Sequence, residues 1–224
     1  MKLRALVCLL LAASNAIGQQ IYDDFSAPNW TAYNTQGVNV YEQQGKLKVD
    51  FLRTASEVNG AWIQGGYMST CRLDGDFDIS TEYYAPIFPA GNGVRIALIT
   101  TPAAAIMGLG DVFGFAVTSR VENSGASLYV SDFYPVPMSS ANAVATTDKS
   151  GRLRLRRIGT QLTGYLWYKV SRAWVVTGQT NSYVTDPVHI KLLAYTVDQL
   201  FADVAVKVAY DNVKIASGTC VKTI

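Results

Sequence analysis

Residues 150–179 constrain the fold of this chain more than any other stretch, because they predict two consecutive β-hairpins. If Gly159-Thr160 is a two-residue turn, Ile158 lies opposite Gln161, and the register of the first hairpin follows. One face then carries leucines, and the other pairs Arg156 with Thr163, Arg154 with Tyr165 and Arg152 with Trp167. A sheet with one buried side has such an apolar face and such a polar face. The stretch therefore predicts an antiparallel sheet whose outer face carries arginines and aromatic rings.

The second hairpin extends this outer face. With Ser171-Arg172 as a two-residue turn, Lys169 lies opposite Trp174 and Trp167 lies opposite Val176. Aromatic rings stack on sugar rings, and arginine forks bind carboxylate or sulfate, so the face favours binding of an acidic polysaccharide. Its candidate residues are Arg152, Arg154, Arg156, Tyr165, Trp167, Lys169 and Trp174. Alternatively, these are cross-strand cation–π pairs of about 0.5–1 kcal/mol each that cover a solvated sheet.

Two basic residues need a separate interpretation. Arg157 falls on the apolar side of its strand, so we expect it at the strand end or beside a carboxylate, because burying it unpaired is costly. His189 alternates with Val188, Ile190 and Leu192, which predicts a solvated strand position. Nothing resembling a nucleophile elbow accompanies this histidine, although a lyase could use it as a base.

The first eighteen residues predict a secretory signal peptide. Lys2 and Arg4 precede a short apolar run, and Ala16-Ile17-Gly18 places small residues where a signal peptidase cleaves. The run is too short to span a bilayer, and we expect no other membrane span. The predicted mature chain, residues 19–224, fits one domain that is secreted to the cell exterior.

Charge and cysteine content limit the classes of partner. The chain has 19 Lys+Arg and 17 Asp+Glu, and removal of Lys2 and Arg4 leaves 17 of each, which argues against nucleic acid. Cys71 and Cys220 are the cysteines of the mature chain, and two cysteines in an oxidising compartment usually form a disulfide. Asn29 begins the one N-glycosylation sequon, Asn29-Trp30-Thr31.

Strand patterns recur along the whole mature chain. They occupy residues 38–41, 46–51, 77–84, 94–98, 113–118, 127–133, 152–158, 162–170, 173–177, 188–195 and 204–215. Near the end, the apolar positions change from even numbers to Val213 and Ile215, which predicts a β-bulge around Asp211-Asn212. With no long amphipathic helix in the pattern, we predict an all-β fold: a two-sheet antiparallel sandwich.

The chain also contains several short sequence motifs. They are DDF (23–25), GKL (45–47), GDFDI (75–79), GRLRLR (151–156) followed by the strand of Trp174, and YDNVKI (210–215). Together they resemble the concanavalin A-like lectin/glucanase superfamily of jelly rolls, over most of residues 21–217. The resemblance implies that the terminal strands meet, which brings Asp24 near Asp211 and suits a Cys71–Cys220 bond. It does not decide function, because the superfamily contains lectins, glycoside hydrolases, polysaccharide lyases and adhesion modules.

Two acidic groups are candidates for chemistry within such a fold. Asp76, Asp78 and Glu82 share one face of a strand, but laminarinase-type enzymes of the superfamily have a Glu-x-Asp-x(x)-Glu row that is absent here. Two residues along a strand span about 6.8 Å, so Asp76 and Asp78 alone approach the spacing of an inverting hydrolase. The alternative is a turn that leads into a strand. The resemblance also implies structural calcium at Asp24, Asp211 and Asn212, unless these side chains serve the turns and the bulge.

The leading interpretation is a secreted carbohydrate-binding protein of jelly-roll fold, without a cofactor or with structural Ca²⁺. The partner is then an extracellular polysaccharide or glycan. An extracellular glycoside hydrolase or polysaccharide lyase is the alternative, and it loses weight because the catalytic row is missing. A cell-surface or matrix interaction module without a sugar ligand is the third interpretation.

Overall fold

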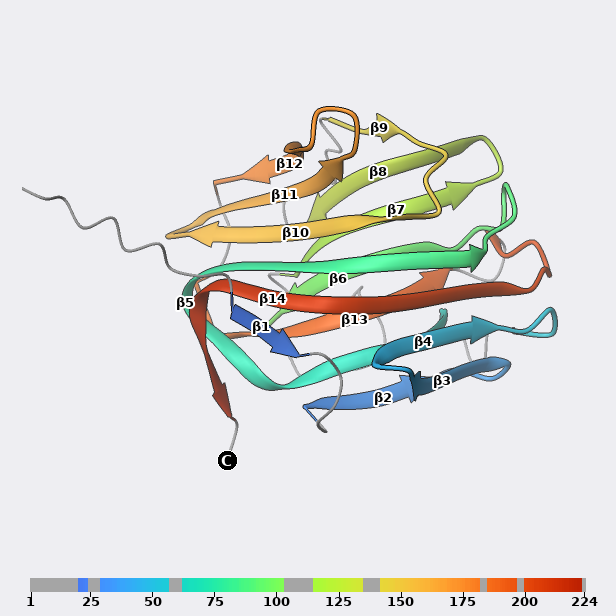
Figure 1. Ribbon diagram of the computed structural model, residues 1–224, viewed down its shortest axis with the longest axis horizontal. Helices are drawn as coiled ribbons and strands as arrows, with labels where there is room; N and C mark the ends of the chain where they lie inside the picture. Colours follow the sequence, from blue (N-terminus) through green and yellow to red (C-terminus); the bar gives the residue numbers. More distant parts are fainter. Residues whose placement is uncertain are drawn as a thin grey trace, which may run out of the picture.

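The computed structural model describes residues 20–23, 29–56, 62–102, 115–134, 142–181, 185–196 and 200–222, so the predicted signal peptide lies outside the described residues. Over these ranges the chain forms fourteen antiparallel strands (Figure 1), which confirms the all-β prediction. No helix within these ranges is long and apolar enough to cross a membrane. The strands are β1 (Gln20–Asp23), β2 (Trp30–Asn34), β3 (Val38–Gln43), β4 (Lys46–Phe51), β5 (Ile63–Ile87), β6 (Arg95–Thr101), β7 (Ala116–Asn123), β8 (Ala126–Phe133), β9 (Val144–Ala145), β10 (Ser150–Ile158), β11 (Gln161–Tyr168), β12 (Ala173–Thr180), β13 (Val188–Thr196) and β14 (Val206–Lys222).

The long strand β5 belongs to both layers of the fold. Its first part, through Leu73, pairs with β2 and β13, and its second part pairs with β10 and β14. Figure 1 shows β5 turning at one end of the molecule, between these two parts. One layer therefore runs β2-β5-β13-β6-β7-β8-β9, and the other runs β3-β4-β14-β5-β10-β11-β12. Because β5 is shared, hydrogen bonding continues from one layer to the other.

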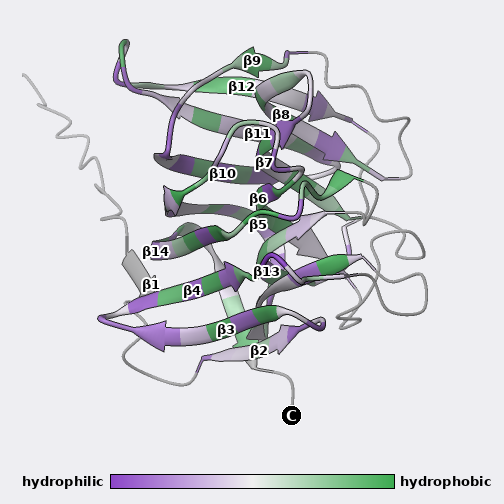
Figure 2. Cartoon of the chain, turned by 90° about the vertical axis from the view of Figure 1, so that its right-hand side faces the viewer, coloured by the Kyte–Doolittle hydropathy of each residue, from purple (hydrophilic) through white to green (hydrophobic). Residues whose placement is uncertain are grey.

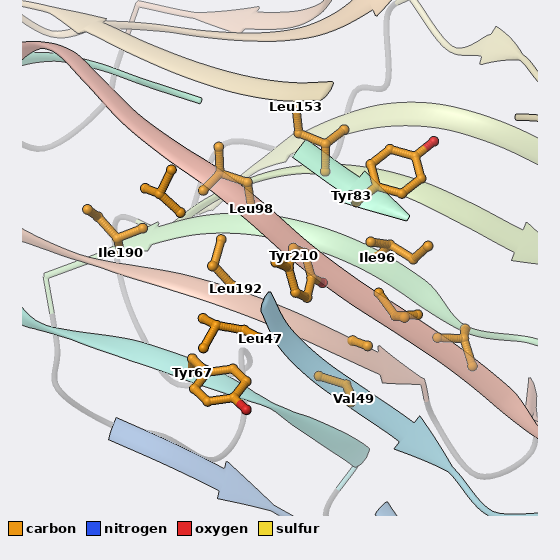
Figure 3. Packing of buried hydrophobic residues seen from close by; sticks show 14 of the residues in the cluster. Leu47, Val49, Tyr67, Tyr83, Ile96, Leu98, Leu153, Ile190, Leu192 and Tyr210 are labelled. Carbon is orange, nitrogen blue, oxygen red and sulfur yellow. The ribbon is translucent and has the colours of Figure 1, made fainter. Parts of the chain in front are cut away.

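The main core lies between the two layers. Successive side chains of a strand point to opposite faces, so every second residue enters the core. Figure 2 shows the resulting alternation of apolar and polar positions along the strands. The close view in Figure 3 shows fully buried leucine and isoleucine side chains from both layers, among them Leu47, Leu153, Ile96 and Ile190. Tyr210 lies among them, and its hydroxyl accepts a hydrogen bond from the Ala97 amide at 3.2 Å.

A second apolar cluster covers the opposite face of β6 and β13. It consists of Tyr33, Ala97, Ile99, Val117, Leu193 and Tyr195. The Trp62 ring stacks on Tyr195 with 5.3 Å between centroids. Both faces of β13 are therefore buried, and the prediction of a solvated His189 is wrong: its side chain is 4% exposed.

The predicted register of the first hairpin is confirmed from Leu153 opposite Leu166 to the turn. Ile158 lies opposite Gln161, and Gly159 supplies the left-handed backbone (φ 55°) that the two-residue turn requires. The second predicted turn is wrong, because Trp167 lies opposite Trp174 and residues 169–172 form a four-residue connection. This difference of register places the two tryptophan rings edge to face, with 5.4 Å between centroids.

The predicted end of the fold is also confirmed. The register of β14 shifts between Asp211 and Lys214, so the predicted bulge is present, and Asn212 within it has a positive φ of 50°. Strand β1 pairs with β14, so the terminal strands meet.

The first part of β5 was missed by the sequence patterns. There Gly66 passes so close to β13 that a Cβ atom would lie 2.1 Å from the Leu192 carbonyl oxygen, and such a glycine interrupts the alternation.

The buried cation Arg157 is held by backbone carbonyls. Its side chain is 1% exposed, and its guanidinium lies 4.8 Å from the centroid of the Phe77 ring. Nε donates to the Gly75 carbonyl at 2.9 Å, and Nη1 donates to the Asp186 carbonyl at 2.8 Å. Arg157 lies one residue before the end of β10, as the strand-end prediction has it, and the partners that its burial requires are backbone carbonyls rather than a carboxylate.

The structure confirms the predicted disulfide between Cys71 and Cys220. The two Cα atoms are 5.5 Å apart, and 149 residues separate the cysteines along the chain. The bond ties the middle of β5 to the end of β14, where these strands already pair. It therefore closes the chain from the middle of β5 to the end of β14 into one loop, and β1 to β4 lie outside this loop.

Replacing both cysteines, in Cys71→Ala/Cys220→Ala, should lower the free energy of unfolding by up to about 5 kcal/mol, because a cross-link over so long a loop restricts the unfolded chain. Urea unfolding followed by tryptophan fluorescence measures this difference. An unchanged midpoint in the double variant contradicts the prediction.

His189 is held neutral by its surroundings. Nδ1 donates to the Ser69 carbonyl at 3.1 Å, and Nε2 accepts a hydrogen bond from Arg72 Nε at 3.1 Å. Burial lowers the pKa of His189 below its ordinary value of 6.5, and the cations of Arg72 and Lys191 lower this pKa further. Protonation would place a third positive charge beside these two.

Stability should therefore decrease as the pH falls below about 6.5, because the unfolded chain takes up the proton of His189 before the folded chain does. Urea unfolding at several values between about pH 7.5 and 5 should show the decrease, and His189→Gln should flatten it. The prediction fails if the variant keeps the full pH dependence of the wild type over this interval.

Candidate functional site

The arginine row and the carboxylate row lie on the same outer face, although the sequence suggested two separate groups. Leu153 and Leu155 of β10 enter the core, so the even-numbered arginines point outward. Strand β10 lies beside the second part of β5, with Arg152 opposite Glu82 and Arg156 opposite Asp78. Strands β11 and β12 add Tyr165, Trp167 and Trp174 to this face.

Cation–π contacts connect the arginines to the aromatic rings. The Arg152 guanidinium lies 5.4 Å from the centroid of Trp167, and that of Arg154 lies 5.0 Å from Tyr165. Arg154 is also 5.4 Å from the centroid of Trp174. The predicted cross-strand pairs are thus present, and they hold the tryptophan rings in fixed positions.

Ion pairs connect the same arginines to the carboxylates. Arg154 binds Asp78 through two bonds: Nε to Oδ1 at 2.7 Å, and Nη2 to Oδ2. Hydrogen bonding to Asp78 raises the pKa of Arg154. Arg152 Nε lies 2.9 Å from Glu82 Oε1. The carboxylates therefore compensate much of the positive charge of the arginine row.

The other carboxylate oxygens of this face serve the fold as well. Asp76 Oδ1 accepts a hydrogen bond from the Gly159 amide at 2.7 Å, so it fixes the turn between β10 and β11. Glu82 Oε2 accepts a bond from Asn212 Nδ2 at 3.0 Å. All three carboxylates are thus bound by partners that belong to the fold. The hydrolytic role of Asp76, Asp78 and Glu82 stays a prediction, and their contacts support a structural role.

The bulge residues that were candidates for calcium have other partners. Lys46 Nζ forms an ion pair with Asp211 Oδ2, and Asn212 donates to Glu82. In the described part of the chain, no three His, Cys, Asp or Glu side chains are grouped as a metal site requires. Asp24 lies outside the described residues. Asp211 and Asn212 as arranged here do not fit a calcium ion, because a lysine already neutralises the carboxylate.

Two hollows open on the outer face, one on each side of Arg152. The first has a volume of about 250 Å³ and is lined by Glu82, Tyr83, Ser150, Gly151, Arg152, Trp167 and Lys169. The second has a volume of about 180 Å³ and is lined by Ser80, Thr81, Glu82, Arg152, Trp167, Trp174 and Lys214. Trp167, Arg152 and Glu82 line both hollows, so they form the ridge between them.

The remaining predicted residues of the face lie around this ridge. Lys169 binds Asp148 at 3.1 Å and lies 3.4 Å from Ser150 Oγ. Arg156 and Tyr165 line neither hollow. The sequence patterns missed Ser80 and Lys214, which lie opposite each other on β5 and β14. Only the strand order brings these two residues beside the hairpin, so no local signal indicates them.

Comparisons with known proteins identify the fold. No family model matches the chain, and no curated protein matches it in sequence. Among solved structures, the Emp47p carbohydrate recognition domain is similar, with a TM-score of 0.58 and 11% identity over 86% of this chain and 90% of that chain. Lectin I from Ulex europaeus, in complex with the methyl glycoside of α-L-fucose, has a TM-score of 0.58 and 9% identity over 84% and 92%. The lectin from Bauhinia forficata in complex with GalNAc has a TM-score of 0.56 and 11% identity over 88% and 96%.

These similarities confirm the predicted fold, a jelly-roll sandwich like that of the lectins named above. Because only about a tenth of the aligned residues are identical, these similarities establish the fold of the chain and carry no information on individual site residues. The site must therefore be argued from its own geometry.

The ion pairs of the face should differ in their contribution to stability. Asp78→Asn removes the carboxylate that binds Arg154. Because the side chains of Arg154 and Asp78 are only 21% and 13% exposed, we expect a loss of about 1–3 kcal/mol in the free energy of unfolding. Glu82→Gln removes the carboxylate that pairs with Arg152. The side chains of Arg152 and Glu82 are 45% and 32% exposed, so this loss should be less than about 1 kcal/mol. Chemical denaturation of both variants measures the two losses, and equal losses contradict this ranking.

Proposed function

We propose that this chain is a carbohydrate-binding protein that holds a glycan across the outer face of β12, β11, β10, β5 and β14. The observation that carries the proposal is the position of Trp167, which lines both hollows of the face. An indole ring between two polar hollows offers the flat apolar surface on which sugar rings stack.

Each hollow has a size that suits contact with a single sugar ring. Their volumes of about 250 and 180 Å³ lie below the roughly 300–1,000 Å³ typical of pockets for drug-sized ligands. A glycan that crosses the ridge would place one ring in each hollow, with Trp167 between them. Polar groups for its hydroxyls are present on both sides, among them Ser80, Ser150 and Glu82.

The state of the carboxylates favours binding over hydrolysis. Glu82 accepts bonds from Arg152 and Asn212, and Asp78 is bound by both nitrogens of the Arg154 fork. Carboxylates that such partners already fix can orient a ligand without rearrangement. A lectin-like role therefore requires no change in these contacts.

The proposed place of action is outside the cell. The signal-peptide pattern of residues 1–18 and the disulfide between Cys71 and Cys220 support secretion, because disulfides persist in oxidising compartments. The partner is then an extracellular polysaccharide or glycan. Whether that polymer is acidic depends on the cations that the carboxylates leave uncompensated.

Affinity electrophoresis of residues 19–224 through gels that contain polysaccharides tests the proposal. At least one polymer should retard the wild type, and Trp167→Ala should weaken the retardation about tenfold, or about 1.4 kcal/mol. The matched control is Tyr41→Ala, which removes an exposed aromatic ring from β3 of the same layer, away from both hollows. If no polymer retards the wild type, the carbohydrate proposal fails and an interaction module becomes the better interpretation.

A further inference from the structure

The second hollow contains a cation that the ion pairs of the face leave uncompensated. Arg152, Arg154 and Lys169 each bind a carboxylate. Lys214 takes part in no ion pair with any residue whose side chain the structure describes. Its side chain is half-buried at the wall of the 180 Å³ hollow, which Arg152, Glu82 and Ser80 also line.

The two hollows therefore differ in charge, although they share one ridge. At the first hollow, the ammonium group of Lys169 is compensated by Asp148, which lies 3.1 Å away and is not itself part of the lining. In the second hollow, the lining carries two cations, Arg152 and Lys214, against the single carboxylate of Glu82. Nε of Arg152 forms an ion pair with Glu82, and this contact orients the rest of the guanidinium group.

We infer that the second hollow selects an anionic sugar, whose carboxylate or sulfate group binds Lys214 and Arg152 while its ring lies against Trp167. The first hollow takes a neutral neighbouring sugar. This inference rests on the proposed function and adds the substrate class and the residue that determines it. Charge-assisted bonds in a half-buried hollow are stronger than those between neutral groups, so one uncompensated cation suffices for the selection.

The placement of Lys214 supports this role. Val213 enters the core, so Lys214 points to the outer face, and it lies directly opposite Ser80 of β5. The bulge at Asp211-Asn212 sets this phase of β14. Without the register shift, the alternation would turn residue 214 to the other face of the sheet.

The test compares Lys214→Gln with Lys214→Arg and with a control, Lys48→Gln. Lys48 belongs to β4 of the same layer, binds Gln43 and lines neither hollow. Gels contain polygalacturonate, alginate or hyaluronan as carboxylate polymers, dextran sulfate as a sulfate polymer, and fully methyl-esterified pectin and dextran as their neutral counterparts. We expect an anionic polymer to retard the wild type more than its neutral counterpart, in a manner that weakens with salt.

Lys214→Gln should weaken retardation by the anionic polymer about tenfold, while Lys214→Arg and Lys48→Gln keep it. Retardation by neutral polymers should stay the same in all variants. If Lys214→Gln does not fold, as judged by thermal unfolding, Ser80→Asp provides the second test, because it supplies a carboxylate that compensates Lys214 from across the strand pair. This variant should lose the same binding.

The outcomes separate the two proposals. If retardation depends on Trp167 but is the same for neutral and anionic polymers, or is unaffected by Lys214→Gln, the anionic selection is overturned while the carbohydrate proposal stands. If no polymer retards the wild type, the carbohydrate proposal itself fails. Loss with carboxylate polymers alone identifies a uronic acid, and loss with dextran sulfate alone identifies a sulfated sugar.

Discussion

The pairing of β5 with four other strands is the constraint on which the rest of the structure depends. Its first part, with β2 and β13, builds one layer, and its second part, with β10 and β14, builds the other. Because side chains alternate along a strand, the same pairing sends Phe77, Ile79 and Tyr83 into the core and turns Asp78, Ser80 and Glu82 outward. Core and candidate site are thus two faces of one strand.

The contact of β5 with β10 also decides the electrostatics of the outer face. Four arginines within six residues suggest a strongly basic surface when the hairpin is considered alone. Because Asp78 and Glu82 form ion pairs with Arg154 and Arg152, two of these four charges are compensated. In the second hollow, the charge that remains for a ligand comes from Lys214 of β14, a strand about sixty residues further along the chain. Local charge counts therefore overestimate the basic character of a paired strand.

The sequence predicted those features that local chemistry determines. The β10–β11 register follows from one two-residue turn, and the bulge at Asp211-Asn212 follows from a change of apolar phase. The turn after Tyr168 was wrong because a four-residue connection and a two-residue turn have similar local signals, and the difference moves Trp174 opposite Trp167. His189 was misplaced because its alternation with apolar residues suggested one solvated face, whereas both faces of β13 are buried. Lys214 depends on strand order, which no local pattern contains.

A site built on strands has a consequence for how it would bind. Trp167 and Trp174 are held edge to face, and Arg152 and Arg154 are fixed by both rings and carboxylates. Little side-chain entropy remains to be lost when a ligand arrives, so weak stacking and hydrogen bonds can yield useful affinity. The same rigidity limits the range of ligands, because the ridge cannot move to admit a larger group. Selectivity on such a face must come from the fixed difference between its two hollows, which is a difference of one charge.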